Sequence, residues 1–475
     1  MKHKFLFILL FSLVLEGMVT TQAVAGDYVH QVNTLIGTKG TGLTSGYLYP
    51  GATYPYGMVQ FTPSYFSKRS GFVINQLSGG GCEHMGNFPT FPVKGKLKMS
   101  PDNILNYRIN VSEEKGHAGY YEAMVQEDIK AKLTVTERTG MASYEYPADQ
   151  QYGTIIIGGG ISATPIEQAA IVITAPNKCE GYAEGGNFCG LRTPYKVYFV
   201  AEFDTDAFET GTWKREELMP NTTFAEGEYS GVYFTFDVNK KKNIQYKIGV
   251  SYVSVENARE NLKAENAEWD FQKIQNQAEA KWNHYLGMIE VEGTNPDRTT
   301  QFYTHLYRSF IHPNVCSDVN GEYMGADFRV HKSRSKHYTS FSNWDTYRTQ
   351  IQLLSMLDPE VASDIVISHQ LFAEQSGGSF PRWVMANIET GVMQGDPTPI
   401  LIANAYAFGA RNYDPKPIFK IMRKGAEEPG SKSQDVETRP GLKQYLDKGY
   451  YNASIQLEYT SADFAIGQFA LHAMG

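Results

Sequence analysis

The stretch that decides how the second half of this chain folds is residues 341–396, where FSNWDTYR (341–348) is followed by GGSFPRWVMANIETGVMQGD (377–396). Apolar residues recur every three or four positions at 349–357 and again at 361–372, and this spacing predicts helices. Aromatic, acidic and glycine residues crowd around those helices. The pattern therefore predicts a helical domain with a polar binding site at its helix ends and on the loop between helices.

The composition is that of a globular protein with a large core. The chain has 475 residues, of which 42% are hydrophobic and 20% are charged, so it can divide into two or more domains. The formal net charge is -8, and no run of five Lys or Arg residues occurs. A nucleic acid or an anionic membrane is therefore not expected as a partner, and we expect a neutral substrate.

A targeting segment is predicted at residues 1–25. Lys2 and Lys4 give it a positive start, residues 5–15 form an apolar run too short to span a bilayer, and Ala-Val-Ala at 23–25 offers a cleavage site. We expect the mature chain to begin near Gly26 and to be exported to the periplasm or the extracellular medium. No later segment reaches about 18 apolar residues, so no membrane span is expected.

The character of the sequence changes near residue 255. Short β-rich segments with turn signals between them predict an antiparallel β-sandwich at 26–255. Examples of such segments are 154–157, 195–203, 232–236 and 244–253. Linker helices are predicted at 256–296, because one helical face there collects the apolar residues Ile274, Ala278, Trp282 and Tyr285. Helical patterns with Gly, Pro and Asp breaks then run through 297–475.

The mature chain contains four cysteines. Cys179 and Cys189 bracket the glycine-rich segment EGYAEGGNF, interpreted as a loop that a disulfide would close, although three pairings are open in principle. Cys82 lies in LSGGGCEHMGN, where no base can be assigned to it, so a structural or ligand-contacting role is favoured over a nucleophile. No C-x-x-C or H-E-x-x-H spacing occurs, and the sequence predicts no structural zinc site.

Two groups of side chains are candidates for binding. Cys82, Glu83 and His84 place a thiol, a carboxylate and an imidazole on one glycine-rich loop, where they either contact ligand hydroxyls or are simply solvated. The second group consists of Trp344, Asp345 and Arg348. In the functional interpretation, a sugar stacks on the Trp344 indole, the Asp345 carboxylate accepts hydrogen bonds from vicinal hydroxyls, and the Arg348 guanidinium orients that carboxylate. The structural alternative is a helix that begins near residue 343, with the acid paired to the arginine.

Six motifs, in order along the mature chain, resemble glycoside hydrolase family 92, the calcium-dependent exo-acting α-mannosidases. They are VNTLIGT, YPGATYPYGMVQFTP, LSGGGC, YTSFSNWDTYR, PRWVMANIETGVMQGD and LEYTSADFAIGQFA. The resemblance implies an N-terminal β-sandwich, linker helices and an incomplete (α/α)6 barrel, with the site at the domain interface. It also implies inverting, calcium-assisted hydrolysis of terminal α-linked mannose from glycans of the N-glycan or mannan type. The calcium ligands are not identified.

The resemblance also implies roles for individual residues. Substrate contacts are implied at Trp344, Asp345 and Arg348, which match WDTYR, and on the leaving-group side at Cys82, Glu83 and His84. Supporting roles are implied at Asn387, Glu389 and Thr390, which match the N-x-E-T-G segment, with Ile388 in place of a polar residue.

The acid and base of the family lie in EGN-like and GNDD-like motifs that do not occur in this sequence. The resemblance therefore implies a C-terminally truncated and inactive chain, whose catalytic carboxylates are expected beyond Gly475. The alternatives are a non-catalytic carbohydrate-binding or structural module, and another inverting (α/α)6 glycosidase that acts on glucose.

Overall fold

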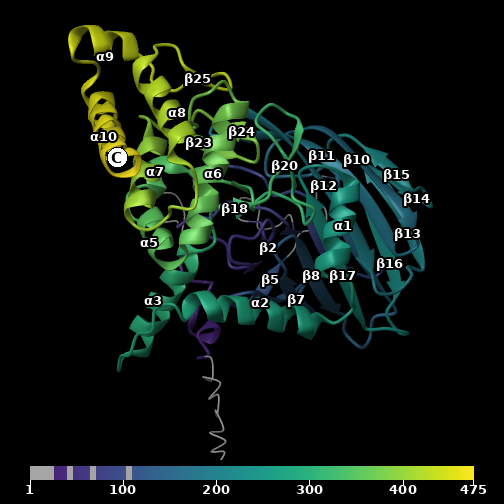
Figure 1. The fold of residues 1–475 in the computed structure, drawn as a ribbon. Helices are drawn as coiled ribbons and strands as arrows, with labels where there is room; N and C mark the ends of the chain where they lie inside the picture. Colours follow the sequence, from purple (N-terminus) through teal and green to yellow (C-terminus); the bar gives the residue numbers. More distant parts are fainter. Residues whose placement is uncertain (1–25, 40–45, 65–70, 103–109) are drawn as a thin grey trace, which may run out of the picture.

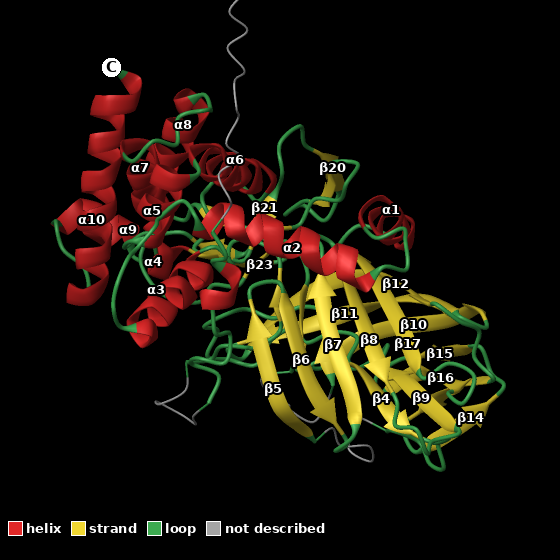
Figure 2. Cartoon of the chain, turned by 90° about the horizontal axis from the view of Figure 1, so that it is seen from below, coloured by secondary structure: helices red, strands yellow, loops and turns green. Residues whose placement is uncertain are grey.

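The computed structural model describes residues 26–39, 46–64, 71–102 and 110–475. The predicted targeting segment, 1–25, lies outside the described residues and stays a prediction. Two antiparallel sheets make up the N-terminal part, and helices dominate the C-terminal part (Figures 1 and 2), so the predicted fold class is confirmed at this level. The last strand of the sheets ends at Ser251, and the first α-helix begins at Val255.

Within the described residues, the two sheets have eight and nine strands. The first has the order β1 (Ala52–Thr53), β2 (Gln60–Pro63), β3 (Phe72–Val73), β4 (Thr90–Lys94), β9 (Tyr152–Ile157), β16 (Ser230–Asp237), β13 (Glu209–Lys214) and β14 (Glu217–Pro220). The second has the order β15 (Phe224–Glu226), β10 (Ile166–Ala175), β11 (Lys178–Phe188), β12 (Leu191–Phe203), β17 (Asn243–Ser251), β8 (Thr139–Glu145), β7 (Ile129–Val135), β6 (Tyr120–Val125) and β5 (Val111–His117).

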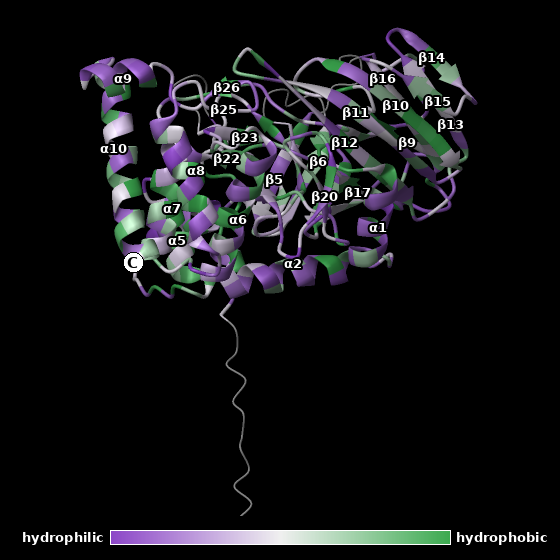
Figure 3. Cartoon of the chain, turned by 45° about the horizontal axis from the view of Figure 1, so that its top comes forward, coloured by the Kyte–Doolittle hydropathy of each residue, from purple (hydrophilic) through white to green (hydrophobic). Residues whose placement is uncertain are grey.

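Alternation of side chains along the strands builds the sandwich core. In β12 the buried residues Thr193, Tyr195, Val197 and Phe199 alternate with half-buried ones, as expected for a strand with one face inward. Phe203 of β12 meets Phe234 of β16 with ring centroids 4.7 Å apart, so both sheets share one core. Figure 3 shows largely hydrophilic outer turns on α1 and α2.

Three capped helices follow the sandwich: α1 (Val255–Glu265), α2 (Phe271–Leu286) and α3 (Pro296–Ser309). Ser254, Asp270 and Asn295 cap them, since each side chain accepts a backbone N–H from the first turn. The apolar face predicted for α2 is confirmed, because Ile274, Ala278, Trp282 and Tyr285 are all buried. The Trp282 indole donates to the Thr53 carbonyl at 2.6 Å, which ties this helix to the sandwich.

The helical domain packs α5 (Gln350–Leu357), α6 (Pro359–Gln375), α7 (Pro397–Ala407), α8 (Pro415–Glu427) and α10 (Ala453–Phe469) against one another. The two helices predicted from residues 349–372 are confirmed as α5 and α6. The shorter helices are η1 (Val29–Gln31), α4 (Asn343–Thr346), α9 (Leu442–Lys448) and η3 (Ala470–Met474). In the described part of the chain, no helix combines the length and apolar character that crossing a bilayer demands.

Small sheets also lie among these helices. The sheet within residues 341–396 falls where the sequence predicted a loop. The largest joins β22 (Phe341–Ser342), β23 (Trp383–Met385) and β24 (Ile388–Glu389). The others pair β18 (Asn314–Val315) with β21 (Tyr338–Thr339), β19 (Glu322–Met324) with β20 (Val330–Lys332), and β25 (Lys432–Ser433) with β26 (Val436–Glu437). This pairing brings the two motif-rich segments of residues 341–396 side by side.

Candidate active site

A pocket of about 470 Å³ lies between the sandwich and the helical domain. The sandwich contributes residues 77–82 and the tip of the β11–β12 hairpin. The helical domain contributes residues 308, 312, 313, 340–343, 345 and 346, together with side chains from α5, α6 and α7. Residues from both halves of the chain therefore form the wall of this pocket.

Two neutral imidazoles hold the start of the glycine-rich loop. The N–H of Leu77 donates to His84 Nε2 at 2.9 Å, and the N–H of Ser78 donates to His312 Nε2 at 2.8 Å. The other nitrogen of each ring is a donor. His84 Nδ1 donates to the carbonyl of Cys82 at 2.6 Å, and His312 Nδ1 donates to the side-chain oxygen of Asn314 at 2.7 Å. Burial lowers the pKa of both histidines to about 4, which keeps them neutral as acceptors.

A third buried imidazole, His369, repeats this arrangement on the helical side of the pocket. Its Nδ1 donates to the carbonyl of Ile365 at 2.8 Å, and its Nε2 accepts from the Asn343 amide at 2.9 Å. Phe341 stacks on the ring with centroids 3.8 Å apart. Burial lowers the pKa of His369 to about 4. A neutral histidine thus fixes the first residue of α4, which carries Asp345 into the pocket.

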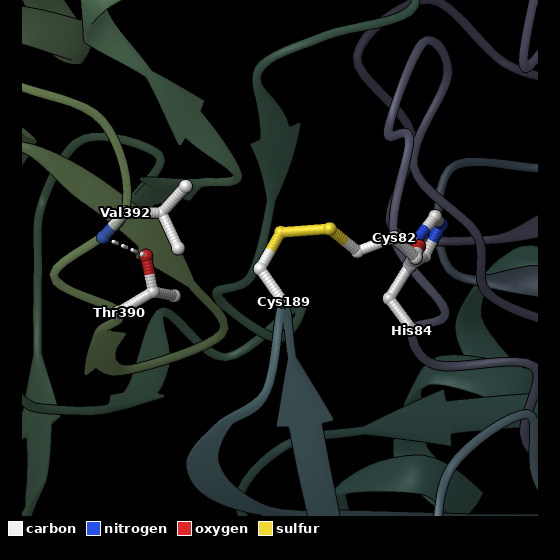
Figure 4. Close-up of a disulfide and its surroundings, with 5 residues drawn as sticks. All are labelled: Cys82, His84, Cys189, Thr390 and Val392. Carbon is white, nitrogen blue, oxygen red and sulfur yellow. Dashed lines mark hydrogen bonds between the residues drawn. A yellow bond between two sulfur atoms is a disulfide. The ribbon is translucent and has the colours of Figure 1, made fainter.

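A disulfide between Cys82 and Cys189 joins the glycine-rich loop to the hairpin tip, with Cα atoms 5.2 Å apart (Figure 4). The predicted Cys179–Cys189 pair is therefore wrong. The segment EGYAEGGNF is not a loop but most of strand β11, and a strand of that length separates its ends by roughly 33 Å at about 3.3 Å per residue. Disulfide formation requires Cα atoms within about 7 Å. Cys179 is instead a buried free thiol in the sandwich core.

The three predicted residues of the loop occupy different environments. Cys82 lines the pocket through its disulfide. His84 is buried, with both ring nitrogens bound to backbone groups, and it positions the loop. Glu83 is exposed and is not part of the described pocket wall. Ligand contact by Glu83 or His84 stays a prediction.

Helix α4 begins at Asn343, which confirms the expected helix start, and it separates the WDTYR residues. Asp345 lines the pocket and accepts a hydrogen bond from the Ser342 hydroxyl. Trp344 turns its indole toward α10 and donates to Glu458 Oε1 at 3.0 Å. The Arg348 guanidinium lies 4.7 Å from the centroid of the Trp344 ring, and no ion pair joins it to Asp345 in the described structure. Of the three predicted substrate contacts in this motif, Trp344, Asp345 and Arg348, Asp345 alone lines the pocket.

The N-x-E-T-G segment includes strand β24 and lies next to the pocket residues Trp383 and Val392, but Asn387, Glu389 and Thr390 do not themselves line the pocket. Glu389 is buried and accepts backbone N–H groups from Arg382, Trp383 and Gly391. Burial raises the pKa of Glu389, although these hydrogen bonds oppose the shift. Thr390 donates to the Trp383 carbonyl at 3.0 Å.

Asn387, the third residue of that segment, is buried and donates to the Gly325 carbonyl at 3.2 Å. Like Glu389 and Thr390, it bonds to backbone groups of the helical domain. The three residues are thus placed to hold β23 and β24 and so to orient Trp383. Their functional role stays a prediction.

Several pocket residues could not be found from local motifs. Trp383 and Phe188 form an apolar wall, with ring centroids 4.6 Å apart and one ring from each domain. Arg308 donates to the carbonyls of Thr34 and Tyr49, and its Nε is a buried donor without a partner among the described residues. Trp383 lies in the PRWVMANIETGVMQGD motif but was not predicted as a contact, whereas Phe188, Arg308, His312 and His369 lie outside the six motifs. Only the tertiary fold brings these residues together.

Two family models match the chain. "Glycosyl hydrolase family 92 N-terminal domain" matches residues 31–251, and "Glycosyl hydrolase family 92 catalytic domain" matches residues 257–475. The chain is also 24% identical to an uncharacterized secreted glycosidase of Arthroderma benhamiae, over 96% of this chain and 62% of that protein.

Solved structures of the family resemble this one. The GH92 α-mannosidase BT3965 from Bacteroides thetaiotaomicron, in complex with mannoimidazole, is 25% identical with a TM-score of 0.83, covering 94% of this chain and 61% of that one. The inverting mannosidase BT2199 from the same organism is 25% identical with a TM-score of 0.81, covering 94% and 62%. The chain thus spans about three fifths of the length of these relatives. Both halves of the sequence and the whole described fold agree, and the chain belongs to glycoside hydrolase family 92.

Proposed function

We propose that this chain carries the sugar-binding part of an exo-acting α-mannosidase that removes terminal α-linked mannose from glycans with inversion. Support comes from the family, from the mannoimidazole complex of BT3965 and from the inverting relative BT2199. Export to the periplasm or the extracellular medium is part of the proposal, because the secreted relative and the sequence of residues 1–25 both favour it.

The observation that carries the proposal is the chemistry of the pocket between the domains. Asp345 offers two acceptor oxygens, which suit two neighbouring hydroxyls of a sugar. The rings of Trp383 and Phe188 offer apolar faces for the ring carbons. The Arg308 side chain lines the same pocket. A neutral, polyhydroxylated ring satisfies all of these groups at once.

Inversion requires a carboxylic acid and a carboxylate on opposite faces of the sugar, roughly 6.5 to 9.5 Å apart. Among the described residues that line the pocket, Asp345 is the one carboxylate. We therefore propose that residues 26–475 bind and orient the sugar, and that at least one catalytic carboxylate comes from outside the described residues that line the pocket.

Calcium is the cofactor that the family resemblance implies, and the described residues fit it only in part. A calcium ion takes six to eight oxygen ligands, several of them carboxylates. The described pocket wall offers one carboxylate, with the hydroxyls of Ser340, Ser342 and Thr346 near it. These oxygen ligands are too few to complete a calcium site. Calcium dependence of the whole enzyme remains a proposal, with further ligands outside this set.

The proposal is tested by comparing this chain with a longer protein that continues to the full length of the relatives. We expect the longer protein to release mannose from an aryl α-mannoside, with β-mannose as the first anomer detected by NMR, and to lose activity in EDTA. We expect this chain to bind mannoimidazole in calorimetry without releasing mannose. Mannose release by this chain would contradict the proposal that its pocket lacks a catalytic carboxylate. Glucose release from the aryl α-glucoside by the longer protein would favour the glucosidase alternative.

Asp345→Asn is expected to weaken binding of mannoimidazole by about 10- to 100-fold, since hydrogen bonds to a charged group contribute roughly 1.5–3 kcal/mol. The amide keeps the size of the side chain but replaces one acceptor oxygen by a donor. Asp297→Asn is the matched control, because Asp297 is an exposed acid in the first turn of α3. Equal affinities of the two variants for mannoimidazole in calorimetry would show that Asp345 does not bind the sugar.

A further inference from the structure

A cluster of side chains that could bind a metal ion lies outside the sugar pocket, where the N-terminal segment runs beside α2. Figure 1 shows the N-terminal segment next to α2. His30 comes from η1, His117 ends strand β5 and Glu279 belongs to α2. One ligand atom from each residue lies within 4.8 Å of the others. No sequence motif joins these residues, and their proximity is a product of the fold.

The distances are close to those that one bound ion requires. His117 Nε2 lies 2.8 Å from Glu279 Oε1, and the rings of His30 and His117 are 4.6 Å apart at their centroids. Two ligands of a tetrahedral zinc ion, each about 2.0–2.1 Å from it, lie roughly 3.3 Å apart. Small rotations of these side chains therefore suffice to surround an ion.

Neighbouring groups already orient the ligands. Asp27 Oδ1 accepts from His30 Nδ1 at 2.6 Å, which leaves His30 Nε2 as the free lone pair. Gln275 donates to Glu279 Oε1 at 2.7 Å. A carboxylate behind a histidine is the usual support of a metal-bound imidazole, because it fixes the tautomer and strengthens the ligand.

The donor set selects the kind of ion. Two imidazoles and one carboxylate suit zinc and similar transition-metal dications, whereas calcium and magnesium prefer oxygen ligands throughout. The side chains of His117 and Glu279 are 17% exposed and that of His30 is 54% exposed, so water can reach a fourth position.

We propose that His30, His117 and Glu279 form a binding site for one zinc-class dication, which joins the N-terminal segment to β5 and α2. Three elements that are distant in sequence would then share one ion. The site is separate from the sugar pocket, and its role is structural.

Calorimetric titration of the chelator-treated chain with ZnCl2 tests the proposal. We expect one equivalent of zinc to bind, a rise of the melting temperature with zinc, and no such rise with CaCl2. His117→Ala and Glu279→Gln are expected to lower the zinc affinity by more than about tenfold, and Asp27→Asn by roughly tenfold, as for the support groups of other metal sites. His305→Ala is the control, since His305 is an exposed histidine on α3.

Each variant is first melted without metal, so that a folding defect is separated from a binding defect. Co2+ serves as a second probe, because imidazole and carboxylate ligands in a four- or five-coordinate site give intense visible bands that an octahedral aqua ion lacks. Absence of stoichiometric zinc binding overturns the proposal. Affinities of His117→Ala and Glu279→Gln equal to that of His305→Ala overturn it as well.

Discussion

Replacement of Cys82 and Cys189 by alanine is expected to lower the free energy of unfolding by about 4 kcal/mol. The two residues are 107 positions apart in the sequence. In the chain-entropy description, closing a loop of about 100 residues restricts the unfolded chain by roughly 4.7 kcal/mol. The bond also joins the glycine-rich loop to the β11–β12 tip, so its loss frees one wall of the pocket, and we expect weaker binding of mannoimidazole.

Urea unfolding of the oxidised chain, of the reduced chain and of the double variant measures this effect. Reduction should shift the midpoint of the wild-type chain to that of the double variant and should leave the double variant unchanged. Mass mapping of nonreduced peptides should recover the Cys82–Cys189 pair. A peptide that links Cys179 to Cys189, or a midpoint insensitive to reduction, would contradict the assignment.

Much of the fold could be predicted because its signals are local. The segments predicted as strands at 154–157, 195–203, 232–236 and 244–253 alternate apolar and polar residues or run apolar. Each corresponds to a strand of the sandwich, although the last of these strands ends at Ser251. The helices α5 and α6 follow the three- and four-residue spacing of their apolar positions. The error in β11 has a physical origin. Its glycines suggested a loop, but Gly181 and Gly185 pair with residues of both β10 and β12, and only Gly186 falls in a register shift between β11 and β12.

The candidate site was less predictable because its decisive contacts are long-range. Asp345 was identified from its motif, and it does line the pocket. Trp344 shares that motif, yet it faces away, because its indole reaches Glu458 on α10, a contact between residues 114 positions apart. His312 accepts a hydrogen bond from the backbone N–H of Ser78, more than two hundred residues earlier in the chain, and no local sequence pattern predicts this contact.

Acidification from about pH 6.5 to 4 is expected to destabilise the chain through its buried histidines. Their ordinary pKa is 6.5, and burial lowers it to about 4 at His84, His312 and His369. In this window the unfolded chain binds protons that the native chain excludes. The stabilisation is therefore fully present above pH 6.5 and is lost as the pH falls toward 4, by up to about 3 kcal/mol for each histidine.

The hydrogen-bond geometry explains why these rings resist protonation. Each Nδ1 is already a donor, and each Nε2 accepts an N–H from Leu77, Ser78 or Asn343. A proton on Nε2 would place two donors against each other in a buried site, which costs the desolvation of both groups as well as the lost hydrogen bond. Because two of these contacts hold the glycine-rich loop, the pocket is expected to open before the sandwich unfolds.

The variant His312→Gln isolates one of these contributions. Buried Glu389 and Asp396, whose pKa values burial raises, act in the opposite direction, so the total slope of stability against pH mixes several groups. Glutamine can still accept and donate but does not titrate, so the variant should be less stable than wild type at pH 8 by about 1–2 kcal/mol and should approach it near pH 4.5. His305→Gln, at an exposed position, should follow the wild-type curve. Parallel curves for wild type and His312→Gln in urea unfolding between pH 8 and 4.5 would show that His312 is not held neutral by the fold.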